Sequence, residues 1–435
     1  MVLGLGTDKP EYSVRDVPDQ SGKTALITGG TTGVGLEVAK VLACKGARTL
    51  VLARREDSPD DALEDIRTYC KDNNAREPEL AFVECDLANL AEVKRIGDEI
   101  CSKEKRLDIL VCDAGVGVQT FDVSADGIDR HFAVNHLGHF LLINRLLPLL
   151  QRTAFTPLPL PSPSPSPSPS SSSPSSPPAQ RLRAPRIVCV TSTLHVAAPF
   201  GVNFISYAEL TAESYAASSP LALYARAKLS SILFVKFGLA PRLNAPPSPP
   251  SSSSPPPSSS SPPPSTSPPN DLPTNDSPAN GPDRAPRARP RGILALAADP
   301  GPIHPGQPDQ LAEAYGPILG PLAKVATTPL ERTPADAARS TLWAATAPEL
   351  DCEGDGDGEG KREGEWRWEE WQGAYVSEPG RRGGESALAQ DEERGRRLWE
   401  MSEDLVRKRL GEGALRPWTW AESGEDGDAR VDGSA

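Results

Sequence analysis

The sequence predicts an α/β fold in which a doubly wound parallel sheet of about seven strands lies between layers of helices. Three observations predict it. Short apolar runs without polar alternation recur along the chain, as is typical of strands buried on both faces. Segments with helical periodicity separate these runs, which favours parallel strands joined by helices. A glycine-rich turn directly follows the first run, where such sheets bind ligands.

The composition indicates one large domain rather than several. The chain has 435 residues, and its 47 prolines are concentrated in serine-proline tracts at 161–178 and 246–269. Such tracts adopt extended conformations without a core, so roughly 350 residues remain for one α/β domain. The expected organisation is an N-terminal extension (1–21), a first half (22–155), an insertion (156–183), a catalytic half (184–244), a second insertion (245–290), the remainder with a C-terminal helix (291–420) and a disordered acidic tail (421–435).

Charge and cysteine usage exclude several classes of protein. The net charge of -13 and the pI near 5.1 argue against binding to nucleic acid or to an anionic membrane. The seven cysteines form no C-x-x-C pair, which suggests free thiols in a reducing compartment. The first residues lack the pattern of a signal peptide, and the longest apolar run, His139 to Leu150, is too short to span a bilayer. We therefore expect a cytoplasmic protein.

The first predicted strand, Thr24 to Thr28, leads into the turn Gly29-Gly-Thr-Thr-Gly33-Val-Gly35 and then into a helix that ends at Gly46. Glycines let backbone N–H groups approach a pyrophosphate, and the helix N-terminus adds the positive end of its dipole. The spacing is T-G-x-x-x-G-x-G rather than G-x-G-x-x-G. A tight turn without a ligand remains the alternative.

The second predicted strand, Thr49 to Ala53, ends in Arg54 and Arg55. An acidic residue at this place binds a ribose 2′-hydroxyl, whereas arginine suits a 2′-phosphate. The pair therefore favours NADP over NAD. Because Glu56, Asp57, Asp60 and Asp61 follow at once, a surface charge cluster is the other interpretation.

Two more strands, at 80–83 and 107–111, end at Asp86-Leu87 and at Cys112-Asp-Ala-Gly115. A long helix is expected from Asp126 to Leu150, ending around Pro148 because proline disrupts helices. Its histidines, His131, His136 and His139, invite a metal interpretation. No carboxylate or cysteine completes a ligand spacing, so we expect no metal.

Each serine-proline insertion lies between the end of a helix and the next expected strand. These strands are expected at 186–190 and at 292–296. Helix-to-strand loops lie at the edge of the sheet opposite the ligand site. Lengthening such a loop from ~5 to ~45 residues costs only about 2 kcal/mol of closure entropy. We interpret the insertions as disordered spacers or as artefacts of the coding sequence; proline-motif ligands and phosphorylation targets are the alternatives.

The last third of the chain holds five further expected features. They are a mobile cover over a pocket at 302–329, an amphipathic helix at 334–350, an acidic-glycine stretch at 351–360, an edge strand at 373–376 and a charged helix at 392–410. The acidic-glycine stretch resembles a calcium loop at first sight. Its bidentate position falls on Arg362, which argues against calcium.

Tyr224 and Lys228 lie four residues apart on a predicted helix and therefore on one face of it. Using a tyrosine with a pKa of ~10 as a base at neutral pH costs about 4 kcal/mol. A lysine ammonium ~5 Å away returns roughly 3 kcal/mol at a dielectric of ~20. The pair could therefore transfer protons near neutrality, although alone it is also an ordinary piece of helix.

Together these motifs resemble the short-chain dehydrogenase/reductases, a family with the Rossmann-type fold, and within them the retinol dehydrogenases and WW-domain oxidoreductases. The resemblance rests on the glycine turn, Asp86-Leu87, Ala114-Gly115, Val134-Asn135, Thr191-Ser192, Tyr224 with Lys228, Pro300-Gly301 and Leu398-Trp-Glu-x-Ser402, in the family's order. It implies an oxidoreductase that interconverts an alcohol and a ketone or aldehyde, with NADP(H) preferred and NAD(H) possible. The substrate would be a small molecule.

The resemblance also implies residue roles. Tyr224 would be the acid/base, Lys228 would assist it and hold the nicotinamide ribose, Ser192 would bind the carbonyl with Tyr224, and Asn135 would anchor a water. The cofactor would contact Gly29, Thr31, Thr32, Gly33, Val34, Gly35, Arg54, Arg55, Asp86, Leu87, Asp113, Ala114, Gly115, Tyr224, Lys228, Pro300, Gly301 and Ile303. Family members often pair through the helices that contain Asn135 and Tyr224, so a homodimer is possible.

The chain departs from the family at Asp113, where Asn is usual, and at Pro305, where a Thr helps to hold the nicotinamide. Two other functions therefore stay open. One is an idle nucleotide-binding sensor or scaffold, which these departures favour. The other is a sugar-nucleotide epimerase, which shares the Tyr/Lys pair but normally has a differently spaced glycine loop.

Overall fold

The computed structural model describes residues 12–158, 183–211, 219–244, 292–301, 332–351 and 368–420. Both serine-proline tracts, the expected cover at 302–329, the stretch at 352–360 and the acidic tail lie outside these residues.

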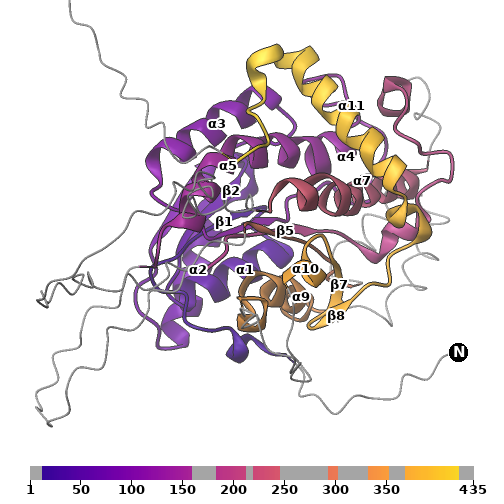
Figure 1. Cartoon of the computed structure of the whole chain (residues 1–435). Helices are drawn as coiled ribbons and strands as arrows, with labels where there is room; N and C mark the ends of the chain where they lie inside the picture. Colours follow the sequence, from indigo (N-terminus) through magenta and orange to yellow (C-terminus); the bar gives the residue numbers. More distant parts are fainter. Residues whose placement is uncertain are drawn as a thin grey trace, which may run out of the picture.

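One eight-stranded sheet runs through the molecule in the order β3-β2-β1-β4-β5-β6-β7-β8 (Figure 1). All neighbouring strands are parallel except β7 and β8, which are antiparallel. The order reverses between β1 and β4, and ligands bind beside such a switch point. The strands are β1 (Thr24–Thr28), β2 (Arg48–Ala53), β3 (Leu80–Glu84), β4 (Ile109–Cys112), β5 (Arg186–Val190), β6 (Leu294–Ala298), β7 (Tyr375–Glu378) and β8 (Arg381–Arg382).

The predicted fold class is confirmed, with one correction at the edge of the sheet. The stretch expected as an edge strand at 373–376 contributes to β7, which pairs with β6 on one side and β8 on the other. The two-residue β8 forms the edge instead. Its short length and its exposed arginines limit unwanted pairing with other chains.

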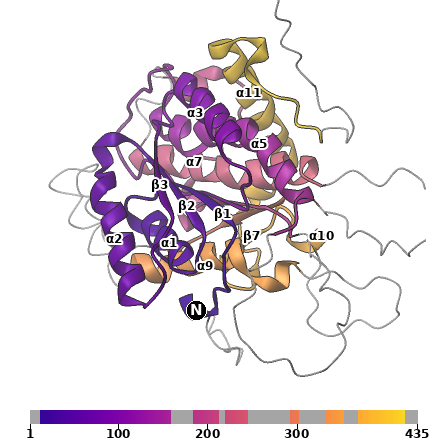
Figure 2. The same ribbon diagram turned by 90° about the vertical axis from the view of Figure 1, so that its left-hand side faces the viewer.

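Helices cover both faces of the sheet, as Figure 2 shows from the side. One face carries α1 (Gly33–Cys44), α2 (Pro59–Asp72) and α9 (Pro334–Thr346). The other carries α3 (Leu90–Lys103), α5 (His139–Phe155), α7 (Pro220–Leu233) and α11 (Glu392–Leu410). Each layer packs its own apolar cluster against the sheet. None of the described helices has the length and apolar character that a membrane crossing requires.

The predicted end of the long helix at Pro148 is wrong, because α5 continues through Pro148 to Phe155. A proline inside a helix costs about 3 kcal/mol through its lost hydrogen bond and its steric clash. Of the 17 residues of α5, 14 are buried, and each buried Leu or Phe contributes about 1.5–3 kcal/mol. Burial of this helix outweighs the cost of its proline.

Before α5 the chain forms a short helical turn, α4 (Arg130–Phe132), and then a π-helical turn at Ala133–Gly138. Leu87 packs directly on Gly138, where any side chain would meet the Leu87 carbonyl oxygen. The turn thereby brings the residues before α5 close to the loop that follows β3.

Helix α11 and the residues after it lie over α5 and α7 (Figure 1). Trp399 of α11 contacts Phe234 and Phe140, and Trp418 contacts both Trp399 and Phe140. In α7, 11 of 14 residues are buried. The helices named as a possible homodimer contact therefore also pack against α11 and the residues after it within one chain.

The second insertion begins and ends at one place in the fold. Asn244 and Gly292 form an isolated antiparallel bridge, and the Ile293 N–H donates to the Leu243 carbonyl over 2.9 Å. The chain segments that flank residues 245–291 are thus tied together by backbone hydrogen bonds.

Candidate active site

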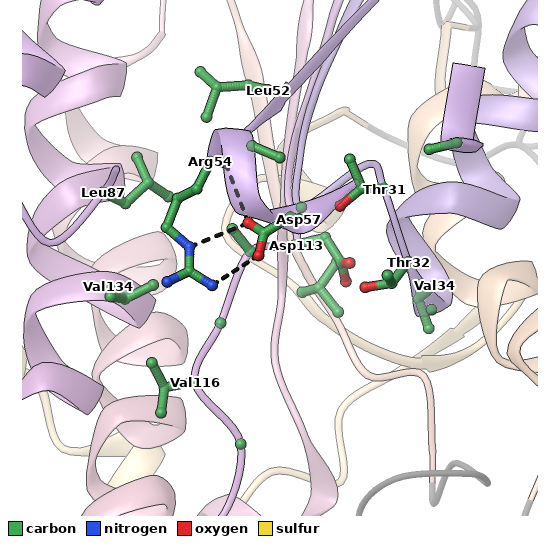
Figure 3. Close-up of a pocket in the computed structure, with 18 of the residues that line it drawn as sticks. Thr31, Thr32, Val34, Leu52, Arg54, Asp57, Leu87, Asp113, Val116 and Val134 are labelled. Carbon is green, nitrogen blue, oxygen red and sulfur yellow. Dashed lines mark hydrogen bonds and ion pairs between the residues drawn. The ribbon is translucent and has the colours of Figure 1, made fainter. Parts of the chain in front are cut away.

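A cavity of about 860 Å³ opens at the carboxyl ends of the central strands (Figure 3). It begins beside the switch point between β1 and β4 and extends towards the ends of β5 and β6. Its lining includes most of the residues singled out in the sequence: Gly29, Thr31, Thr32, Gly33, Val34, Arg54, Asp86, Leu87, Asp113, Ala114, Gly115, Ser192, Tyr224, Lys228, Pro300 and Gly301.

The glycine turn after β1 forms one wall of the cavity. Gly29 and Gly33 have φ values of +67° and +60°, which residues with side chains rarely adopt. A Cβ at Gly29 would lie 2.8 Å from the Ala114 Cα, so only glycine allows this approach. Gly35 is buried behind the turn, where its N–H donates to the Asp113 carboxylate. The N-terminus of α1 therefore faces the cavity, as a phosphate site requires.

The two arginines after β2 point to different places. Arg54 lines the cavity and forms an ion pair with Asp57. Arg55 lies outside the lining, where its side chain is 61% exposed, pairs with Glu84 and covers the Phe82 ring. Of these two cations only Arg54 is placed to contact a molecule in the cavity.

Apolar side chains that the sequence analysis did not assign complete this end of the cavity. Val116 follows β4, and Val134 belongs to the π-helical turn. Figure 3 shows both on the same side as Leu87, near the Arg54 guanidinium. Val134 stands next to Asn135 in a motif already singled out, which was a usable signal; Val116 had none.

Tyr224, Lys228 and Ser192 meet at the other end of the cavity. Their exposed fractions are 5%, 6% and 5%, although all three contribute to the lining. The Lys228 ammonium donates to the Val190 carbonyl over 2.9 Å and lies 5.8 Å from the centre of the Tyr224 ring. Burial lowers the pKa of Lys228, while the charges of Asp113 and Asp299 oppose this shift.

Ser192 is held in place by residues that the sequence did not reveal. His195 donates from Nδ1 to the Ser192 carbonyl over 2.8 Å, and its Nε2 accepts from the Ser386 N–H over 3.0 Å. Thr193 donates to the Asp299 carboxylate over 2.7 Å. This carboxylate also accepts from Tyr375 and from the Gly301 N–H, so it joins the Ser192 loop to the Pro300–Gly301 turn.

Asn135 lies beside the cavity but is not part of its lining. Its side chain forms two hydrogen bonds with the backbone of Val116, accepting over 2.7 Å and donating over 3.0 Å. The backbone carbonyl oxygen of Asn135 lies within hydrogen-bonding distance of His139 Nδ1 (3.3 Å) and Ser231 Oγ (3.4 Å). Asn135 therefore fixes the loop after β4 relative to α5 and α7.

Asp113 places a carboxylate in the cavity wall, between the glycine turn and Lys228. Burial raises the pKa of Asp113 to about 6, against the lowering effects of Lys228 and the Gly35 N–H. Near pH 7 a negative charge therefore lies close to the place where a pyrophosphate would bind.

Three histidines suggested a metal site in the sequence, but each of them forms a hydrogen bond with a different partner. His131 pairs with Asp129, His136 with Ser402, and His139 with Thr28. Burial lowers the pKa of His136 to about 3 and of His139 to about 4, so both are neutral. Among the described residues no group of three His, Cys, Asp or Glu side chains is arranged to hold a metal ion. Ile303 and Pro305 lie outside the described residues.

Comparisons with known proteins agree on one family. The family model described as short chain dehydrogenase matches residues 23–155. A mitochondrial protein of Neurospora crassa assigned as an oxidoreductase (bli-4) is 32% identical over 227 residues, 52% of this chain and 48% of that protein. Retinol dehydrogenase 12 of Mus musculus is 36% identical over 133 residues, 31% of this chain and 40% of that protein.

A solved structure shares the fold. The crystal structure of an uncharacterised protein from Mycobacterium paratuberculosis has a TM-score of 0.52 and 21% identity, and the match covers 91% of this chain and 97% of that one. The chain spans about half the length, or less, of the curated relatives it matches. These matches agree with the parallel sheet and with the cavity beside its switch point: residues 23–155 match the short chain dehydrogenase family, and the chain is similar to oxidoreductases of that family.

Proposed function

We propose that the chain is an NADP-preferring oxidoreductase of the retinol dehydrogenase-like branch, which interconverts an alcohol and a ketone or aldehyde. The observation that carries the proposal is a single cavity that joins the glycine turn to Tyr224, Lys228 and Ser192. One end of this cavity suits a dinucleotide, and the other offers groups that can exchange a proton with a substrate oxygen.

The residues of the chain fit such a cofactor. The backbone of the glycine turn and the N-terminus of α1 would hold the pyrophosphate. Asp86, Leu87 and Val134 would enclose the adenine end, with Arg54 beside them for a 2′-phosphate. When bound, the nicotinamide supplies or accepts the hydride.

The chain's own groups would manage the proton and the charge. In the direction of reduction, the Tyr224 hydroxyl donates its proton to the substrate oxygen, and the Ser192 hydroxyl donates a hydrogen bond to the same atom. The Lys228 ammonium stabilises the negative charge that develops on the Tyr224 oxygen, in a site with little access to water. Oxidation runs through the same steps in reverse.

For Asn135 the contacts support a positioning role. The Asn135 side chain is engaged by the Val116 backbone on both its oxygen and its nitrogen, and its backbone carbonyl lies 3.3 Å from His139 Nδ1. We therefore assign to Asn135 the task of holding the loop after β4 against the cavity.

Turnover of carbonyl compounds tests the proposal. Purified chain is incubated with NADPH and a panel of ketones and aldehydes, and NADPH consumption is followed. We expect turnover by the wild type and loss of at least two orders of magnitude for Tyr224→Phe, with NADPH affinity retained because the ring remains. If no compound reacts faster with the wild type than with Tyr224→Phe, while both bind NADPH, the sensor interpretation replaces this one.

The contribution of Arg54 is tested by binding alone. Arg54→Gln should weaken NADPH binding and leave NADH binding nearly unchanged. Arg55→Gln is the matched control, because its side chain lies outside the lining. Equal effects of the two variants would contradict the assignment of Arg54.

A further inference from the structure

Arg54 does not stand free in the cavity, because Asp57 holds its guanidinium through two hydrogen bonds. Arg54 Nε donates to Asp57 Oδ2 over 3.1 Å, and Nη2 donates to Oδ1 over 2.7 Å. Such paired contacts fix both the position and the plane of a guanidinium. The Asp57 carboxylate also accepts from the Arg54 backbone N–H over 3.1 Å, so the whole residue is held (Figure 3).

The remaining guanidinium nitrogen is near a second carboxylate. Arg54 Nη1 lies 3.5 Å from Glu56, and both Glu56 and Asp57 belong to the cavity lining. The positive charge that would attract a 2′-phosphate is thus already balanced by neighbouring carboxylates. The side chains of Arg54 and Asp57 are 36% and 29% exposed, so water and a ligand can reach the pair.

A phosphate and a hydroxyl make different demands on this pair. A 2′-phosphate needs guanidinium donors and carries close to two negative charges, so it must draw Arg54 away from Asp57 and approach that carboxylate. A neutral ribose 2′-hydroxyl requires no such exchange and can donate to a carboxylate oxygen. The pair therefore weakens binding of one nucleotide and leaves the other nearly unaffected.

We propose that Asp57 is a specificity-determining residue that competes with the cofactor's 2′-phosphate for Arg54 and thereby narrows the preference for NADPH over NADH. This inference rests on the proposed dinucleotide site. It assigns to one carboxylate the discrimination between two nucleotides that differ by one phosphate group. The chain accordingly uses both cofactors, with a smaller ratio of affinities than Arg54 alone would produce.

Removal of the Asp57 charge tests this inference. Asp57→Asn keeps the shape of the side chain and an oxygen that can cap the Arg54 N–H. The dissociation constants of NADPH, NADH, adenosine 2′,5′-bisphosphate and 5′-AMP are measured by calorimetry at fixed ionic strength. We expect Asp57→Asn to bind the two 2′-phosphorylated nucleotides about three- to ten-fold more tightly, the range expected for freeing a partly exposed ion pair and removing one like charge. The affinities for NADH and 5′-AMP should change less than two-fold.

Two further variants separate this effect from general changes of charge. In an Arg54→Gln background Asp57→Asn should retain only the smaller gain that comes from removing one like charge, because there is no arginine left for Asp57 and the phosphate to compete for. Asp336→Asn on α9 breaks an ion pair of the same sequence spacing, that with Arg339, outside the cavity. It should leave the affinity ratio at the wild-type value.

Three results would overturn the inference. They are an unchanged NADPH/NADH ratio in Asp57→Asn, a ratio shifted towards NADH, or a full effect that persists without Arg54. Failure of the proposed function looks different, because a wild-type chain that binds none of the four nucleotides has no dinucleotide site at all. Asp57→Ser, which can still cap the loop, repeats the test should the asparagine variant not fold.

Discussion

Asp113→Asn is expected to make the protein more stable, and only above about pH 4. Burial raises the pKa of Asp113 from 3.8 to about 6 in the folded chain. Between these values the unfolded chain has lost the proton while the folded chain still holds it. The contribution of Asp113 to the free energy of unfolding therefore falls as the pH rises from about 4 to about 6 and then stays level. Asparagine has no proton to lose, so the variant is spared this loss.

The size of the effect follows from the shift. A difference of 2.2 pKa units at 1.36 kcal/mol per unit corresponds to about 3 kcal/mol at pH 8, and the same relation leaves about 1 kcal/mol at pH 4.5. The attraction between Asp113 and Lys228 is already contained in this shift, which is the net of burial and the opposing effects of Lys228 and the Gly35 N–H. We expect a net stabilisation of about 1–3 kcal/mol at pH 8.

Urea unfolding of wild type and Asp113→Asn between pH 4.5 and pH 8 measures this directly. Urea is preferred to guanidinium because it does not screen charges. The reasoning is refuted if the variant is less stable than wild type at pH 8, or if the difference between them does not grow with pH.

Two other predictions concern the framework of the site. Asp129→Ala should destabilise the protein by about 3–5 kcal/mol, because Asp129 and Arg226 form an ion pair that is fully buried and the arginine would lose the carboxylate that balances its charge; urea unfolding measures it, and a cost below 1 kcal/mol would contradict it. Deletion of residues 246–269 should leave the melting temperature within a few degrees and NADPH affinity within a few-fold, because the backbone bridge of Asn244 with Gly292 already closes the insertion. A deletion variant that fails to fold would show that this segment is more than a spacer.

The strands were the most predictable part of the fold. Thr24–Thr28 and Arg186–Val190 are buried at every residue. Strands of this kind are recognisable in a sequence from their apolar composition alone. The end of the helix was predicted wrongly at Pro148, because burial of the surrounding leucines stabilises the helix by more than the proline destabilises it. Local patterns decide an element when nothing distant opposes them.

The candidate site was predictable where a motif is contiguous in sequence. The glycine turn and the Tyr224–Lys228 pair belong to such motifs, and both line the cavity. The sequence could not separate Arg54 from Arg55, since side-chain directions just after a strand depend on local pairing with Asp57 and Glu84.

Contacts between distant segments were beyond prediction for a simpler reason. His195 meets the Ser386 backbone across 191 positions, and Asp299 meets Thr193 across 106. No spacing rule links residues so far apart. These partners became visible only when the fold placed β5, β6 and β7 side by side.

The cover formed by α11 changes how the stability of this protein depends on its concentration. Where two subunits shield each other's helices, dilution exposes those helices and weakens the fold by mass action. Here Trp399 and its neighbours are attached to the surface they cover, so the shielding is intramolecular. The contacts that shield Phe140 and Phe234 therefore do not depend on a second chain.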